Sequence, residues 1–184
     1  MKKFTLIIAL ILTTVVMAQS EEKLPYYEIP EYPETYTAGT VAARMVDGLG
    51  FRYYWATEGL RQEDLNYKPS ESGRTSAETI DHLLGLSNFL LNALSEEKRD
   101  ENQKEFTFEQ KRKQTLLNIK EASEILKATE DISKFDNDRF PFWNLINGPI
   151  ADALWHCGQV VMLRRASGNP FNSKVSVFSG KLRE

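Results

Sequence analysis

Two ionisable side chains lie one helical turn apart in an otherwise apolar segment. In ADALWHCGQV, residues 151–160, Asp152 and His156 are four positions apart, and Gln159 continues the same polar stripe. Positions i and i+4 share one face of an α-helix, so the carboxylate and the imidazole can converge on one point. A carboxylate on a mostly apolar helix needs a compensating charge, hydrogen bonds or a metal ion, because burying it unpaired is costly.

The chain has one further histidine, His82, in the helical pattern SAETIDHLLGLSNFLLNAL. His82 lies at the edge of a wide apolar arc, a position that lines pockets or helix seams. With Asp152 and His156 it would supply two imidazoles and one carboxylate from two helices, as bundle metal sites commonly do. We therefore predict one divalent metal ion with three protein ligands and positions left open for water or substrate. Zinc would activate water there, whereas iron would be the redox alternative.

The same residues admit a purely structural interpretation. A histidine on a mostly apolar face is usually a core residue with ordinary partners, and two ligands at i and i+4 are a weak motif. Asp152, in the first turn of its helix, can simply complement the helix dipole. Glu78, one turn before His82, is a candidate fourth ligand, but the pair Thr75 and Glu78 fits a capping box, which explains Glu78 better.

Other residues near these ligands have simpler explanations. Cys157, the single cysteine, faces about 100° away from His156 on a helix, which disfavours a Cys-His pair. We predict a buried, inert thiol. Trp143 and Trp155 are expected in the core, and Gly158 is expected to let two helices approach closely.

Four helical patterns would position these side chains, and no segment is a convincing strand, so an all-α four-helix bundle is predicted. Apolar residues recur at helical spacing within residues 35–60; a second helix starts at the first capping box and ends near residue 95. A third helix starts at a weaker capping box, Thr107 and Gln110, and ends near residue 130.

The fourth helix opens at NGP, residues 147–149, and closes at SGNP, where a glycine can take the left-handed conformation. Its apolar residues lie on nearly all sides, which predicts a buried helix. Arg164 and Arg165 in its last turn are expected only to complement the helix C-terminus. The polar segment RQEDLNYKPSESGR, residues 61–74, is predicted to be a loop.

The segments outside the bundle have their own signatures. Residues 1–18, MKKFTLIIALILTTVVMA, combine two lysines, an apolar run and small residues before a cut, which predicts a cleaved signal peptide and a periplasmic or secreted protein. A retained anchor is disfavoured because the apolar run is short for a membrane span. Residues 19–34 contain three prolines and predict an extended arm. In the C-terminal tail, residues 171–184, the segment VSVF contains β-branched residues, but the sequence shows no strand with which it could pair.

Composition narrows the function classes. An apolar fraction of 41% is enough for one compact core in 184 residues. The net charge is -3, and removal of Lys2 and Lys3 with the signal peptide makes it about -5, with no basic cluster left. We therefore expect no nucleic-acid partner, and no membrane association after cleavage.

The polar stripe in DALWHCGQVVMLRRASGNP, together with LNYKPSESGRTSAETIDHL, resembles the DinB-like superfamily of four-helix bundles. The resemblance covers roughly Thr35 to Pro170. It implies a divalent metal held by three histidines, of which His82 matches the first and His156 the last. Asp152 replaces the middle histidine, which keeps a ligand type but changes charge and reach.

The resemblance implies one of the family's activities, which include thiol transfer, isomerisation and hydrolysis. Members of the family are often dimers, so the resemblance also implies a homodimer. Export weighs against thiol transfer, because soluble thiols belong to the reducing cytosol. We therefore expect a metal-dependent hydrolase or transferase of a small molecule, with zinc, iron, nickel or manganese as the cofactor. The alternative is a non-catalytic bundle that binds a metal or ligand.

Overall fold

The computed structural model describes residues 23–95 and 105–184. The predicted signal peptide and the first four residues of the predicted arm lie outside the described residues. The described chain is mostly helical, with one very small sheet. None of its helices is both long enough and apolar enough to cross a membrane.

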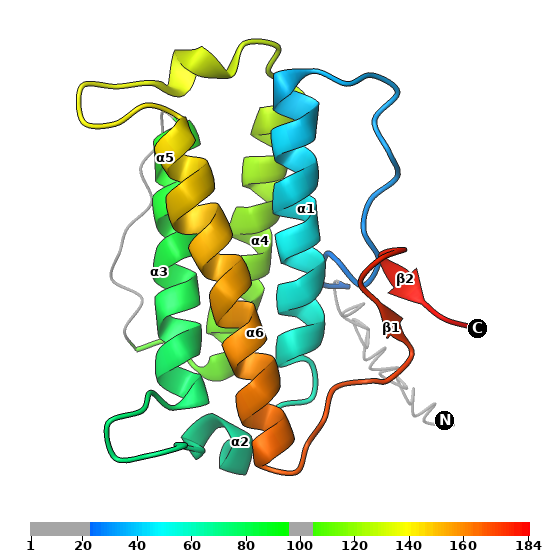
Figure 1. Cartoon of the computed structure of the whole chain (residues 1–184), viewed down its shortest axis with the longest axis vertical. Coiled ribbons are helices and arrows are strands. Elements are labelled where there is room, and N and C mark those ends of the chain that lie inside the picture. Colours follow the sequence, from blue (N-terminus) through cyan, green and yellow to red (C-terminus); the bar gives the residue numbers. More distant parts are fainter. Residues whose placement is uncertain (1–22, 96–104) are drawn as a thin grey trace, which may run out of the picture.

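Four long helices form the body of the molecule (Figure 1). They are α1 (Ala38–Thr57), α3 (Ser76–Leu94), α4 (Phe108–Lys127) and α6 (Ala151–Ala166). Helices α1 and α3 each pack against both α4 and α6, so the four surround one apolar core. The prediction of an all-α bundle agrees with this arrangement.

Side-chain caps fix where three of these helices begin. The Thr75 and Thr107 hydroxyls accept hydrogen bonds from the backbone N–H groups of Glu78 and Gln110, and the side chains of Glu78 and Gln110 accept from the two threonine N–H groups. Both predicted capping boxes are therefore confirmed. A capping box that the sequence analysis missed, at Thr37, starts α1. Each box satisfies backbone donors that a helix start leaves unpaired.

The segment expected to be a loop before α3 contains a short helix, α2 (Gln62–Asn66). Its Asp64 side chain accepts a hydrogen bond from the Arg61 backbone N–H and two from the Arg61 guanidinium. Asp64 also accepts hydrogen bonds from Ser167 and Asn169 beyond the end of α6. This buried carboxylate thus joins α2 to α6, which the polar composition of the segment did not indicate.

The chain bends sharply before α6. Between α4 and α6 lie a 3-10 turn, η1 (Ile132–Phe135), a helical turn, α5 (Trp143–Leu145), and a π segment, η2 (Ile146–Ile150). Gly148 in η2 has a non-helical ψ of -107° and Pro149 follows it. Regular helix therefore starts only after Pro149, near the predicted opening.

Helix α6 is not buried on all sides, contrary to the prediction. Trp155 is 73% exposed and Met162 is 62% exposed, while the buried positions are Ala153, Cys157, Val160 and Arg164. The reason is that α6 packs with one face on α1 and α3, and among the described residues no further layer covers its outer face. The outer apolar side chains therefore meet solvent.

Arg164 does more than complement the end of its own helix. Its side chain is buried, and its guanidinium donates to the backbone carbonyls of Trp55, Ala56 and Glu58 at the end of α1 and to that of Asn169. These hydrogen bonds satisfy carbonyls that a helix end leaves unpaired. Arg164 therefore fixes the lower end of α6 to α1.

The arm and the tail pack together beside α1. The buried Tyr26 ring lies against Gly50, where a Cβ atom would come within 2.5 Å of it, and its hydroxyl donates to Asp47. The tail forms an antiparallel hairpin of β1 (Val175–Ser176) and β2 (Lys181–Leu182). The prediction that the chain has no strand was therefore wrong for these two short segments. The Ile29 N–H donates to the Gly180 carbonyl and joins the arm to the hairpin.

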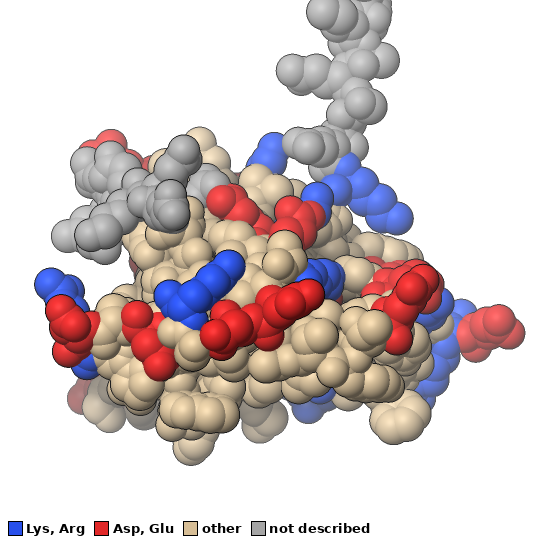
Figure 2. All heavy atoms as spheres, turned by 90° about the horizontal axis from the view of Figure 1, so that it is seen from above, with Lys and Arg blue, Asp and Glu red and all other residues tan. Residues whose placement is uncertain are grey.

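Charged side chains of both signs are interspersed on the end of the bundle that Figure 2 shows. Lysine and arginine side chains lie there among aspartate and glutamate side chains. Elsewhere on the bundle, Lys111 forms an ion pair with Asp81, and Arg112 with Glu58. The described residues on this face form no continuous basic patch.

Candidate metal centre

The three predicted ligands converge between α3 and α6. His82 lies on the second turn of α3, and Asp152 and His156 lie on the first two turns of α6. One potential ligand atom from each of the three lies within 4.8 Å of the others. The structure therefore brings together three side chains, two of them 70 residues apart, and this group, named here the triad, could hold a metal ion.

The carboxylate of Asp152 sits between the two imidazoles. Its Oδ2 is 3.2 Å from His82 Nε2, and its Oδ1 is 3.4 Å from His156 Nε2. The two rings are nearly perpendicular, at 87°, with centroids 4.5 Å apart. Both Nε2 atoms thus face the same carboxylate, which is the arrangement that two nitrogen ligands and one oxygen ligand need around a common ion.

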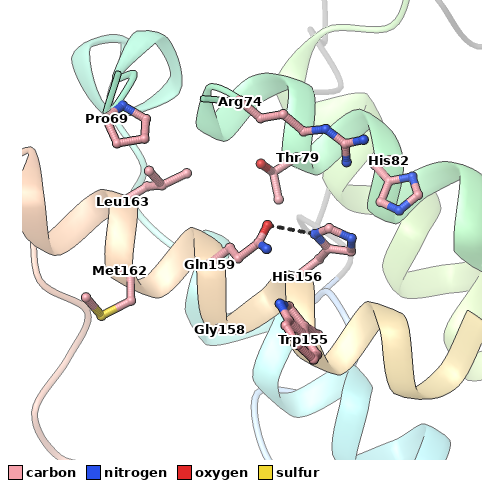
Figure 3. A pocket seen from close by; sticks show the side chains of 10 residues that line it. All are labelled: Pro69, Arg74, Thr79, His82, Trp155, His156, Gly158, Gln159, Met162 and Leu163. Atoms are coloured by element: carbon pink, nitrogen blue, oxygen red, sulfur yellow. Dashed lines mark hydrogen bonds between the residues drawn. The ribbon is translucent and has the colours of Figure 1, made fainter. Parts of the chain in front are cut away.

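Gln159 orients one of these imidazoles. His156 Nδ1 lies 2.8 Å from Gln159 Oε1 (Figure 3). When Nδ1 donates its proton to this oxygen, the lone pair of a neutral imidazole is on Nε2, the atom that faces Asp152. A nitrogen lone pair and a carboxylate oxygen facing each other repel unless a cation lies between them. A metal ion is one such cation; in the other tautomer of His156 no cation is needed, because the Nε2–H group donates to the carboxylate.

The orienting role of Gln159 was missing from the sequence analysis, which placed this residue only on the polar stripe. The signal that could have found it is the spacing HxxQ, because positions i and i+3 on a helix are neighbours. A ring nitrogen that does not bind the metal is typically hydrogen bonded in metal sites, and this second contact fixes the ring orientation.

Burial differs among the triad side chains. The His156 side chain is 12% exposed, whereas those of His82 and Asp152 are 36% and 42% exposed. The idea that Asp152 is a deeply buried carboxylate is therefore wrong. One side of the triad is accessible to solvent, as a site with open coordination positions requires.

Two neighbouring candidates are not part of the triad. The Glu78 carboxylate accepts hydrogen bonds from the backbone N–H and hydroxyl of Thr75, and these bonds lower its pKa. This supports its assignment to the helix cap. Cys157 is buried on the other side of α6, and burial raises the pKa of its thiol to about 12. The predicted burial of the thiol is thus confirmed, and its inertness stays a prediction.

A cavity of about 820 Å³ opens beside the triad, named here the α3–α6 cavity (Figure 3). Its volume is in the range typical of small-molecule sites. Its lining comprises Pro69, Arg74, Thr79, His82, Trp155, His156, Gly158, Gln159, Met162 and Leu163. Two members of the triad thus form part of its wall.

Side-chain exposure and the lining of the cavity correct three predictions about apolar and small residues. Trp155 lines it and is largely exposed, and Trp143 is 67% exposed, so neither is a core residue. Gly158 also lines it, and a Cβ atom there would meet nothing within 4 Å, so this glycine does not mediate a close helix contact. An aromatic residue that lines a pocket has the same helical spacing as one in a core, which is why the sequence could not separate them.

Searches of protein-family models, curated proteins and solved structures found no match to this chain. The resemblance to DinB-like bundles therefore stays a prediction.

Proposed function

We propose that this chain is a metal-dependent enzyme, a hydrolase or transferase that acts on a small molecule. The observation that carries the proposal is the convergence of His82, Asp152 and His156 at the wall of an open cavity large enough for a small substrate. The donor set of two imidazole nitrogens and one carboxylate oxygen fits a divalent transition metal. Zinc, iron, nickel and manganese are the candidates.

A divalent metal ion at such a site supplies Lewis acidity and lowers the pKa of water that binds to it. The chain's own residues hold and tune the site. Asp152 offsets one of the two positive charges of the ion, and Gln159 holds the His156 ring so that Nε2 faces inward. The exposed sides of His82 and Asp152 leave room for a substrate to approach from the cavity.

A second candidate function is a binding module that holds a metal or ligand without bond cleavage. The observation in its favour is the lining of the α3–α6 cavity. Apart from the two histidines, the described lining residues include no carboxylate, lysine, cysteine or tyrosine. The cavity therefore offers no independent general acid to protonate a leaving group.

We further propose that the bundle is DinB-like, exported and homodimeric. The expected ligand positions on the second and fourth long helices, α3 and α6, support the family assignment. The pattern of residues 1–18 in the sequence supports export. The homodimer is implied by the family resemblance alone.

The test is the metal content of tag-free protein expressed with its N-terminal segment intact, measured by elemental mass spectrometry. The matched variant is the double substitution His82→Ala, His156→Ala. We expect about one equivalent of a single metal in the parent and background in the variant. Background metal in both proteins would instead support a metal-free, hydrogen-bonded triad with a structural role.

Turnover then separates the two metal-binding functions. Metal-loaded protein is assayed against a panel of small esters, amides and thiol adducts. Hydrolysis or transfer that is lost in the double variant supports the enzyme. Stoichiometric metal, a ligand retained in native mass spectrometry and no turnover across the panel would favour the binding module and contradict the enzyme.

A further inference from the structure

We propose that the α3–α6 cavity takes a small organic carboxylate, whose charged group pairs with Arg74 and whose apolar part lies against Trp155 and Met162. This inference names the class of substrate. Only the claim that the bound carboxylate is chemically converted rests on the proposed function. The pairing itself is a property of the cavity and can be measured without a metal.

Charge is the first argument. Arg74 is the only lysine or arginine among the described residues that line the cavity. None of these lining residues is an aspartate or a glutamate. No described carboxylate forms an ion pair with Arg74. Its acidic neighbours in sequence are Glu71 and Glu78, and Glu78 already accepts hydrogen bonds from Thr75. The Arg74 guanidinium therefore has its donors available, and a planar fork of N–H groups matches a carboxylate.

The apolar wall is the second argument. Trp155 and Met162 project from the outer face of α6 at 73% and 62% exposure, and Leu163 and Pro69 complete the wall. Large exposed apolar side chains that gather around one cavity indicate a contact surface for a ligand or partner. An aryl or branched alkyl group would cover this wall, whereas a fully charged small anion such as phosphate would leave it wet.

The relative placement of Arg74 and the triad is the third argument. Arg74 immediately precedes the cap of α3, and His82 lies about two turns further along, which separates their backbones by about 12 Å at the helical rise per residue. In Figure 3 the Arg74 side chain extends along α3 toward His82. The length of a ligand that meets both is set by the distance from the guanidinium to the triad, so probes of increasing length are the appropriate test.

The experiment uses full-length protein and three probes of increasing length: phenylacetate, 3-phenylpropionate and 4-phenylbutyrate, each beside its neutral amide. Binding is measured by calorimetry and by tryptophan fluorescence, to which the exposed Trp155 contributes. Each titration is done on chelator-treated protein and on protein with one equivalent of zinc. Arg74→Gln removes the proposed partner. Lys68→Gln, a matched control, removes the same charge from an exposed residue of the same loop that does not line the cavity.

We expect at least one carboxylate to bind chelator-treated parent about tenfold more tightly than its amide, which is about 1.4 kcal/mol. Arg74→Gln should bring this ratio close to one, while Lys68→Gln should leave it within about twofold. Equal binding of acids and amides, or a preference that survives Arg74→Gln in both metal states, would overturn the proposal. A missing metal site would not, because the chelator-treated arm tests Arg74 alone.

Discussion

The substitution Asp152→Asn tests whether the carboxylate of the triad is a metal ligand. Asparagine has almost the same shape and keeps one oxygen, so packing is preserved while the charge is removed. The side chain is 42% exposed, so screening close to that of water is the appropriate assumption. At a ligand distance of about 2.1 Å, a divalent ion and a carboxylate then attract each other by about 4 kcal/mol.

That energy corresponds to about a thousandfold loss of metal affinity. The assay is competition for zinc against a chromogenic chelator, with thermal unfolding by circular dichroism to show that the variant is folded. The matched control is Glu78→Gln, one turn from His82 on the same helix. Its amide can still accept the Thr75 N–H, so we expect its zinc affinity to change by at most about fivefold.

Two results would refute this reasoning. Zinc binding by Asp152→Asn within tenfold of the parent would show that the carboxylate is not a ligand. A large loss in Glu78→Gln as well would show that the assay reports the general charge of this region and not coordination. If neither the parent nor the variants bind zinc, Asp152 acts as a hydrogen-bond acceptor for the two imidazoles.

Three further predictions concern stability and reactivity. Hydrogen bonds from Arg61 hold the pKa of Asp64 well below its usual range. This carboxylate therefore adds stability above about pH 4 that is lost as the pH falls toward its folded pKa. In denaturant titrations between about pH 2 and 5, the free energy of unfolding of Asp64→Asn should depend less on pH than that of the parent. Cys157, buried with a pKa of about 12, should react with a thiol reagent at pH 8 only in denaturant, and fast reaction of native protein would contradict its burial. Gly39→Ala places a Cβ atom 1.9 Å from a backbone carbonyl oxygen and should lower the free energy of unfolding by about 2 kcal/mol or more. Gly85→Ala, with nothing within 4 Å of the new Cβ atom, should raise it by up to about 1 kcal/mol in the same denaturation assay.

Local signals predicted the helices well. The capping boxes at Thr75 and Thr107 fixed the starts of α3 and α4 because a cap depends on residues only three positions apart. The short helix α2 was missed because its stability comes from Asp64, whose partners include residues beyond α6. Composition within the segment cannot reveal a contact made about a hundred residues away.

The site was predicted less completely than the helices. Spacing alone put Asp152 and His156 on one face of α6, but their approach to His82 depends on how α3 and α6 align along their axes, which packing decides. The exposure of Trp155 depends on which face of α6 stays uncovered, and Arg164 becomes buried only because α1 ends beside it. These facts are relations between helices, and helical periodicity carries no information about them.

The contact between the arm and the hairpin determines where the C-terminus lies relative to the cavity. The Ile29 to Gly180 hydrogen bond holds the hairpin beside α1, while the cavity opens between α3 and α6 on another side of the bundle (Figure 1). A dye, a bead or a second polypeptide attached at Glu184 would therefore project away from the cavity mouth. Immobilisation through the C-terminus should leave ligand entry unobstructed, so sensor-chip kinetics can be recorded on the native bundle.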